Sequence, residues 1–381
     1  MKHSTRILLA AGATAVAAAL VLSGCSSSST PSGSSTTQKL TPVTLQLQWV
    51  TQAQFAGYYA ALAQGYYKKE GLDVTIKQAG TDTVPIKSVA DGDADYAISW
   101  VPKVLGSIEQ GVNVTDVAQI FERGATTQIS FTNKNISTPA DLKGKKVGSW
   151  GYGNQWALFA GMQKAGINTD TGITLVQQAF DMKGFLAGDI DAAQAETYNE
   201  YAQVLETINP ATGKLYQPSD LNVIDWNKYG TAMLEDAIWA DADKLKDTKY
   251  QDQTVKFIKA SIEGWVYARD NAQKAADDVT KAGSTLGTSH QLWMTNEVNK
   301  LIWPSTSGIG VIRKSLWDQT VKISKSTKDN TGSTVITKDP PTTAYSNTYV
   351  DKALKELKAE GVDVMGKSFT PLTVTLKEGG N

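Results

Sequence analysis

The chain has 381 residues, a formal net charge of −1 and a hydrophobic content of 41%. A charge so close to balance excludes the strongly basic surface by which nucleic-acid-binding proteins are recognised. The length is sufficient for two domains. The 10 Trp and 14 Tyr residues are many, and aromatic side chains in this number favour a search for a site that holds a flat ligand.

The N-terminus has the pattern of an export signal. Lys2 and Arg6 precede an uncharged apolar run, which ends in Leu22-Ser23-Gly24-Cys25. This order of basic, apolar and small residues is typical of a secretory signal peptide, and its last four residues resemble the bacterial lipobox. Cys25 is the only Cys of the chain, so no intrachain disulfide can form, and lipidation accounts for a lone Cys in an exported protein.

We therefore expect residues 1–24 to be a lipoprotein signal peptide. Residues 25–40 are then the lipidated Cys25 and a disordered tether, because a run of Ser and Thr buries little apolar surface. The alternative is an uncleaved anchor, since the 18 uncharged residues of 7–24 reach the lower limit for a spanning helix. Either interpretation places the rest of the chain outside the membrane.

From Val43 onward, strand-like runs alternate with helical stretches, which predicts an α/β fold with parallel strands. The first unit has predicted strands at 45–49, 72–76 and 96–100, and predicted helices at 55–69, 83–90 and from Pro102 to Gly111. A second unit begins near Ser137, with predicted strands at 146–150 and 173–176 and a helix at 155–165.

A short motif supports two related units. The run Gly92-Asp93-Ala94-Asp95-Tyr96-Ala97 recurs 96 residues later as Gly188-Asp189-Ile190-Asp191-Ala192-Ala193, each time between a helix and a strand. Coincidence in a chain rich in Gly, Asp and Ala is the alternative. The symmetry predicts two similar α/β lobes that face each other across a cleft.

This organisation predicts domain boundaries. Residues 41–130 form the first part of lobe 1, 131–225 form lobe 2, 226–327 return to lobe 1 with C-terminal helices, and 328–381 are a peripheral segment. Strands at 222–226 and 237–240 are expected to cross back to lobe 1. Helices are expected at 250–269, 272–281 and 291–302, and another at 349–360 within the peripheral segment.

Catalytic and metal-binding patterns are not evident. His290 is the only His of the folded part, and we expect it at the surface or as a helix cap. We expect no metal site, no cofactor and no enzymatic activity, because clustered ligands and a nucleophile with its base are both missing. Gly151 and Gly153 allow a tight turn before the helix at Gln155, whose N-terminal amides could receive an anionic group; a merely structural turn is the alternative.

Candidate ligand-binding residues follow from a topological rule. Open α/β sheets bind ligands beyond the carboxyl ends of their strands. The rule selects Trp49, Gln52, Gln54, Tyr58, Ser99, Trp100, Trp150, Tyr152, Asn154, Glu196, Tyr198 and Asn199. Aromatic faces stack on flat rings, while amides and carboxyl groups read ring nitrogens and amines. For each Trp, packing in the core is the alternative.

The same residues carry a family resemblance. Leu47-Gln48-Trp49, the run from Gln54 to Tyr59, the run from Gly65 to Val74 and the run from Asp141 to Gly148 resemble the SsuA/THI5-like (NMT1-like) solute-binding proteins of bacterial ABC importers. The resemblance extends over approximately residues 43–239. It implies a type II periplasmic-binding-protein fold, a monomer that closes on its solute, and delivery to a permease and its ATPase at the outer face of the cell membrane.

Within this family, the aromatic opening after Gln48-Trp49 is most similar to binders of thiamine pyrimidine precursors. The resemblance thus implies a small flat nitrogen heterocycle, with riboflavin or an aliphatic sulfonate or nitrate-type anion as alternatives. Thiamine pyrimidine synthases belong to the same superfamily, but their pyridoxal phosphate chemistry uses a His and a Cys-rich segment that this chain lacks. An exported structural lipoprotein without a cleft is a further alternative.

Overall fold

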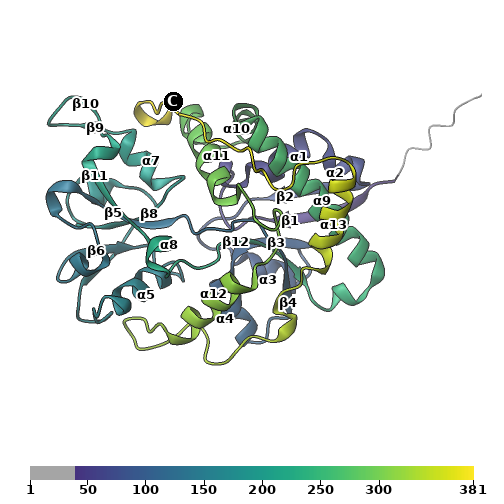
Figure 1. Ribbon diagram of the computed structural model, residues 1–381, viewed down its shortest axis with the longest axis horizontal. Helices are drawn as coiled ribbons and strands as arrows, with labels where there is room; N and C mark the ends of the chain where they lie inside the picture. The colour runs from purple at the N-terminus through teal and green to yellow at the C-terminus, as the bar shows by residue number, and fades with distance from the viewer. Residues whose placement is uncertain (1–38) are drawn as a thin grey trace, which may run out of the picture. The chain divides into compact units, whose positions relative to one another are not determined.

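A computed structural model describes residues 39–381 (Figure 1). The expected signal peptide, the lipidation site at Cys25 and nearly all of the tether lie outside the described residues. Within residues 39–381, no helix combines the length and the apolar character needed to cross a membrane.

Short strands and helices alternate through most of this body. The strands are β1 (Thr41–Gln46), β2 (Leu72–Lys77), β3 (Tyr96–Trp100), β4 (Val114–Gln119), β5 (Thr126–Phe131), β6 (Lys146–Ser149), β7 (Thr174–Gln177), β8 (Ala193–Glu196), β9 (Ile208–Asn209), β10 (Lys214–Leu215), β11 (Leu221–Asp225) and β12 (Asp236–Asp241). The α-helices are α1 (Ala56–Ala63), α2 (Tyr66–Lys69), α3 (Pro85–Ala90), α4 (Val101–Glu109), α5 (Trp156–Lys164), α6 (Lys183–Leu186), α7 (Glu200–Leu205), α8 (Trp226–Tyr229), α9 (Thr248–Asp270), α10 (Ala272–Lys281), α11 (Thr288–Ile302), α12 (Lys314–Ser326) and α13 (Thr348–Ala359).

Ten of the twelve strands form two sheets with the same internal order, and β9 and β10 form a separate antiparallel pair. Lobe 1 has the order β2-β1-β3-β12-β4, in which only β12 runs against its neighbours. In lobe 2, β11-β5-β8 and the parallel pair β6-β7 are joined by a bridge between Val147 and Ala192. The lobe 2 order β7-β6-β8-β5-β11 therefore repeats that of lobe 1, strand for strand.

The repeated motif has the same structural role in both lobes. Gly92 follows α3 with φ +82° and Gly188 follows α6 with φ +84°, the left-handed conformation that favours glycine at a helix end. Asp95 then accepts the backbone N–H of Thr44 at the edge of β1, at 2.8 Å. Asp191 accepts the backbone N–H of Lys146 in β6, at 3.0 Å. The recurrence in the sequence thus reflects a recurrence in the fold.

The chain passes between the lobes twice, and both passages modify the expected boundaries. After β4 it enters β5, which pairs with β8 and β11, so lobe 2 already begins near Thr126 rather than at 131. After β11 it returns into β12, which pairs with β3 and β4. The strand expected at 222–226 therefore stays in lobe 2, and only the strand expected at 237–240 lies in lobe 1.

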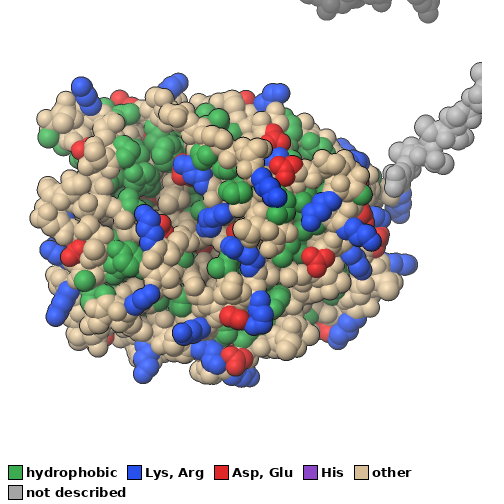
Figure 2. All heavy atoms as spheres, in the orientation of Figure 1, with side chains coloured by type: hydrophobic (Ala, Val, Ile, Leu, Met, Phe, Trp, Pro, Cys, Tyr) green, Lys and Arg blue, Asp and Glu red, His purple; other side chains and the backbone are tan. Residues whose placement is uncertain are grey.

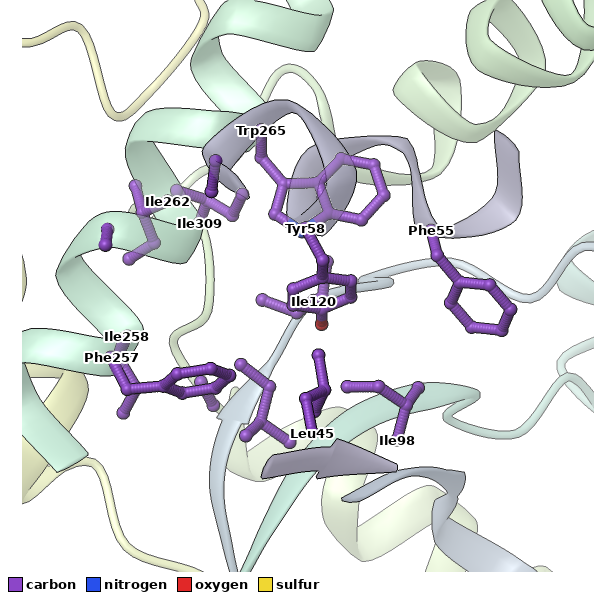
Figure 3. Close-up of a cluster of buried hydrophobic side chains, with 14 of the residues drawn as sticks. Leu45, Phe55, Tyr58, Ile98, Ile120, Phe257, Ile258, Ile262, Trp265 and Ile309 are labelled. Carbon is purple, nitrogen blue, oxygen red and sulfur yellow. The ribbon is translucent and has the colours of Figure 1, made fainter. Parts of the chain in front are cut away.

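Helices cover both faces of the lobe 1 sheet (Figure 1). One buried cluster joins strand residues such as Leu45 and Ile98 to α1, α9, α11 and α13. A second cluster packs α3, α4 and α12 on the other face, around Trp239. Figure 3 shows part of the first cluster, in which Tyr58 and Trp265 lie over the strands.

Three expectations about helices are corrected. The helix expected at 55–69 is interrupted at Gly65, whose φ of +76° separates α1 from α2. Helix α13 is not peripheral, because Val350, Ala353 and Leu357 are fully buried in the core of lobe 1. Helix α12 was not anticipated, although its apolar positions recur with helical spacing.

The closest helix contact of the core depends on two glycines. Helices α1 and α9 approach so closely that a Cβ atom on Gly264 would lie 2.0 Å from the carbonyl oxygen of Gly57. We expect Gly264→Ala to lower the free energy of unfolding by about 2 kcal/mol or more, since backbone must move to admit the methyl group. Urea denaturation of the two proteins measures the change.

Gly184→Ala in α6 is the matched control, because the nearest atom to its Cβ would be Ile190 Cδ1 at 3.6 Å. This variant should be as stable as the parent chain or slightly more stable, since Ala favours a helix over Gly. Equal stability of the Gly264 and Gly184 variants would contradict the tight packing of α1 against α9.

Candidate ligand-binding site

A cavity of about 580 Å³ lies where the two lobes meet. Figure 2 shows a hollow near the middle of the face that it presents. The lining residues come from both lobes and from the C-terminal part of the chain; they are Gln48, Trp49, Gln52, Gln54, Gly80, Thr81, Thr83, Val84, Pro85, Ile86, Ser99, Trp100, Pro102, Lys103, Gly106, Ser107, Trp150, Tyr152, Gly153, Asn154, Trp156, Phe180, Glu196, Tyr198, Asn199, Glu200, Thr334 and Val335.

Most of the residues selected from the sequence meet in this cavity. Trp49, Gln52, Gln54, Ser99, Trp100, Trp150, Tyr152, Asn154, Glu196, Tyr198 and Asn199 all line it. They converge because the carboxyl ends of β1, β3, β6 and β8 point toward the junction of the lobes. The pseudo-symmetric pair Trp100 and Glu196 forms the last residues of β3 and β8.

Tyr58 does not belong to this set. Its side chain is 1% exposed and its ring meets that of Trp265 edge-on, with centroids 5.5 Å apart. In Figure 3 it points from α1 toward the sheet, into the core of lobe 1. The expectation that Tyr58 faces the cleft is wrong, because the helix that follows Gln54 turns this position inward.

Aromatic rings form one wall and connect the two lobes. Phe180, in the loop after β7, lies between Trp49 of lobe 1 and Trp150 of lobe 2. The ring centroids of Phe180 and Trp49 are 4.7 Å apart, and those of Phe180 and Trp150 are 6.2 Å apart with nearly parallel planes. Such a wall offers faces on which a flat ring can stack.

A hydrogen-bonded network fixes the polar side chains of lobe 1. Asp236, the first residue of β12, accepts hydrogen bonds from Gln48, from Gln54 Nε2 at 3.0 Å and from Trp100 Nε1 at 2.9 Å. Gln52 Nε2 in turn donates to Gln54 Oε1 at 2.8 Å. These contacts determine the orientation of the Trp100 ring and of the three glutamines that border the cavity.

Carboxyl groups gather in and beside the cavity, where Glu196 and Glu200 line it. Glu196, Glu200, Glu235 and Asp236 are all buried. Burial raises the pKa of Glu200, Glu235 and Asp236 to about 7 each, and it also raises the pKa of Glu196, where the charges of Glu235 and Glu200 add to the effect. This cluster of carboxyl groups therefore holds on to a proton at a pH where exposed carboxyl groups are ionised.

Lys103 is the one basic side chain among the lining residues. Its ammonium group lies 4.8 Å from the centroid of the Trp100 ring, within the range of a cation–π contact. Burial lowers its pKa to about 8, while the charges of Asp236, Glu196 and Glu235 oppose that shift. A single ammonium group thus faces several carboxyl groups.

Two buried polar atoms of lining residues have no hydrogen-bond partner within residues 39–381. They are Trp150 Nε1, a donor, and Glu196 Oε2, in residues that are 3% and 4% exposed. Leaving such an atom unsatisfied costs about 1–3 kcal/mol. A ligand that accepts a hydrogen bond from one and bonds to the other would remove this penalty.

The turn between β6 and α5 keeps its amides occupied. Gly151, Tyr152 and Gly153 all have positive φ, between +51° and +85°. The N–H of Gly153 donates to Gln155 Oε1 at 3.0 Å, and the N–H of Asn154 donates to the carbonyl of Gly151 at 2.9 Å. These two groups are therefore engaged within the turn, whereas the expected anion site on the first amides of α5 stays a prediction.

His290 is buried, which corrects its expected place at the surface. The ring on α11 contacts Glu206 through Nδ1 at 2.9 Å and Asn199 Oδ1 through Nε2 at 3.1 Å. Glu206 and Asn199 flank α7 of lobe 2, so His290 joins a C-terminal helix to that lobe and supports a residue of the cavity wall.

Several lining residues were missed by sequence reasoning. Phe180 and Trp156 stand outside strand ends, Lys103 lies one turn into α4, and Thr334 with Val335 comes from the segment expected to be peripheral. Gln48 was missed as well, although its place beside Trp49 offered a signal. Nothing in the local sequence marks the other missed residues. Within residues 39–381, no group of three or more His, Cys, Asp or Glu side chains is placed to hold a metal ion.

Comparison with known proteins supports a common fold. The periplasmic aliphatic sulphonate binding protein SsuA of Escherichia coli superposes with a TM-score of 0.56 at 15% identity, over 89% of this chain and 94% of that protein. The two-lobed α/β periplasmic-binding-protein fold expected from the sequence is thereby confirmed.

Sequence relatives are more similar but still distant. The formylaminopyrimidine-binding protein of Halalkalibacterium halodurans is 22% identical over 243 residues, which cover 62% of this chain and 69% of the relative. The riboflavin-binding protein RibY of Chloroflexus aurantiacus is 24% identical over 306 residues, 74% of this chain and 79% of the relative. Residues 52–275, more than half of the chain, match the family described as NMT1/THI5 like, and the chain belongs to this family.

Proposed function

We propose that the protein captures a small flat nitrogen heterocycle, of the kind represented by thiamine pyrimidine precursors, as the solute-binding component of an ABC importer. The observation that carries the proposal is the cavity itself, which combines an aromatic wall with two buried, unpartnered polar atoms. Its volume of about 580 Å³ lies within the range typical of small-molecule sites, roughly 300–1,000 Å³.

The composition of the wall favours a heterocycle over an anion. Lys103 is the one basic side chain of the lining, so the wall offers an anionic sulfonate a single cationic partner. A heterocycle instead presents ring faces to Trp49, Phe180 and Trp150, and edge nitrogens to the polar atoms. The formylaminopyrimidine-binding relative is named for such a compound.

Riboflavin is the second candidate, because a relative is a riboflavin-binding protein and the aromatic wall suits a flavin ring as well. The alternative of a synthase-like enzyme has less support. Its implied chemistry uses a His and a Cys-rich segment, whereas His290 is engaged by Glu206 and Asn199 and Cys25 is the only Cys of the chain.

We further propose that a lipid on Cys25 holds the protein, as a monomer, at the extracytoplasmic face of the cell membrane. There it would hand its solute to the permease and the associated ATPase. The Ser-rich and Thr-rich stretch after Cys25 would give the folded body freedom to approach the permease.

Replacement of the anchor residue tests this arrangement. Cys25→Ser cannot be lipidated and should move the protein from the membrane fraction to the soluble extracytoplasmic fraction. Immunoblotting of the two fractions measures the shift. Full retention of Cys25→Ser in the membrane would instead support an uncleaved N-terminal helix.

A ligand panel tests the capture of a heterocycle. We expect 4-amino-2-methylpyrimidine compounds to quench or shift Trp fluorescence and to raise the melting temperature, since binding to the folded state alone adds about 4 kcal/mol at a thousandfold excess over Kd. Riboflavin and taurine are tested in parallel. A response to taurine alone would overturn the heterocycle, and no response to any solute would overturn capture.

Trp150→Phe probes the unpartnered indole N–H. Phe keeps an aromatic face but lacks the indole N–H, and no side-chain hydrogen bond to described residues is lost, so affinity for the pyrimidine should fall about threefold to tenfold. Titration calorimetry measures this change. Trp226→Phe is the matched control, because its Nε1 is equally buried and unpartnered but lies in the core of lobe 2, outside the cavity lining.

The control should bind with unchanged affinity. Equal affinity of Trp150→Phe and the parent chain would mean that the ligand does not use this N–H.

A further inference from the structure

Within the cluster of buried carboxyl groups beside the cavity, one hydroxyl group lies between two carboxyl groups. Thr126, the first residue of β5, places Oγ1 at 3.0 Å from Glu196 Oε1 and at 2.9 Å from Glu235 Oε1. All three residues are buried. Glu196 lines the ligand cavity, whereas Glu235 and Thr126 lie behind it, at the passages between the lobes.

The group contains too few donated hydrogen atoms for both carboxyl groups to be ionised. The hydroxyl of Thr126 carries one proton and can donate it to only one of the two oxygens. Glu235 already accepts the N–H of Ala125 on both oxygens at 2.9 Å, and the N–H of Thr126 at 3.1 Å, as an ionised carboxylate would. A carboxyl proton on Glu196 completes the set, with Glu196 donating to Thr126 and Thr126 donating to Glu235.

The surroundings favour a proton on Glu196. Glu200, on α7, accepts the backbone N–H of Glu196, and Asp236, on β12, also faces the group. Tyr198 adds a buried phenol, and Lys103 on α4 supplies a positive charge. Burial and the like charges of Glu235 and Glu200 raise the pKa of Glu196. Both oxygens of Glu235 accept hydrogen bonds, whereas Glu196 Oε2 has no partner in the described chain.

We propose that Glu196, Thr126 and Glu235 hold one shared proton, and that this proton selects ligands with a basic ring nitrogen, to which Glu196 passes it on binding. The carboxyl proton of Glu196 leaves Oε1, where it faces Thr126, and is delivered from Oε2, the oxygen without a partner. The lone pair of the ring nitrogen forms the new N–H bond and the O–H bond of Glu196 breaks. A cationic ring then faces a carboxylate, and the total number of protons is unchanged.

This inference rests on the proposed function and narrows its ligand class. Aminopyrimidines are nitrogen bases, because the amino group donates electron density to the ring nitrogen. The flavin ring is a far weaker base, and a sulfonate is no base at mildly acidic or neutral pH. Thr126 becomes a positioning residue for specificity, although it does not line the main cavity.

Nitrogen NMR tests the proton transfer directly. Ring-labelled ¹⁵N 4-amino-2-methylpyrimidine is bound to the full-length chain at a mildly alkaline pH where the free probe is neutral. We expect the ring-nitrogen resonance of the bound probe to move upfield, toward the position of the protonated base. With Glu196→Gln the resonance should stay near that of the neutral base, since an amide cannot transfer its proton.

Thr126 variants test the shared proton. Thr126→Val has nearly the same shape but no hydroxyl, so we expect affinity for the probe to fall about tenfold to hundredfold, as for a lost hydrogen bond to a charged group. The upfield displacement should shrink as well. Thr126→Ser restores the hydroxyl and should restore both readouts, which a loss of packing alone would not predict.

The outcomes separate the two proposals. A bound probe that keeps the resonance of the neutral base in the parent chain would overturn the proton transfer and leave heterocycle capture intact. Equal affinity and equal displacement in Thr126→Val would overturn the role of the shared hydroxyl. Failure of this probe and of every other heterocycle to bind would overturn the proposed function itself, and the inference with it.

Discussion

The contact on which the arrangement of the lobes depends is that of the Glu235 carboxylate with the backbone of Ala125 and Thr126. The chain passes from lobe 1 to lobe 2 just before β5 and returns just before β12. Glu235 lies at the end of the returning passage and binds the amides at the end of the outgoing one. Because buried amides require partners, this side chain holds the two passages side by side, together with the hydrogen bonds between Asn227 and Gly124.

The composition of the cavity follows from that constraint. Strand ends of both lobes are brought to the passages, so Trp100 and Glu196, which hold corresponding places in the two repeats, face the same space. The repeat has diverged at this position into an indole in one lobe and a carboxyl group in the other. Both lobes therefore supply ring faces, but the carboxyl groups of the lining, Glu196 and Glu200, belong to lobe 2.

The sequence predicted those parts of the structure that depend on local patterns. Strand ends, glycine helix ends and the repeated Gly-Asp motif are encoded within a few residues, and they were sufficient to bring most of the candidate site together. Tyr58 was misplaced because its orientation depends on one turn of helix after Gln54. Phe180, Lys103 and Val335 were missed because they reach the cavity from loops and helix faces, through contacts between residues far apart in the chain. The same applies to α13, whose burial depends on packing against α9 and β4.

The C-terminal segment has a consequence for how the lobes can move. Trp293 on α11 donates to the carbonyl of Thr197, His290 contacts Glu206, and the N–H of Gly379 donates to the carbonyl of Glu206 at 3.0 Å. These contacts attach lobe 2 to the last helices of the chain, apart from the two strand passages. The lobes are thus connected at a third place besides the two strand passages, and a motion that closes the cavity has to preserve or break these contacts. A tag fused at Asn381 would strain these contacts with lobe 2. A label that reports the closing of the lobes should therefore be placed at another position.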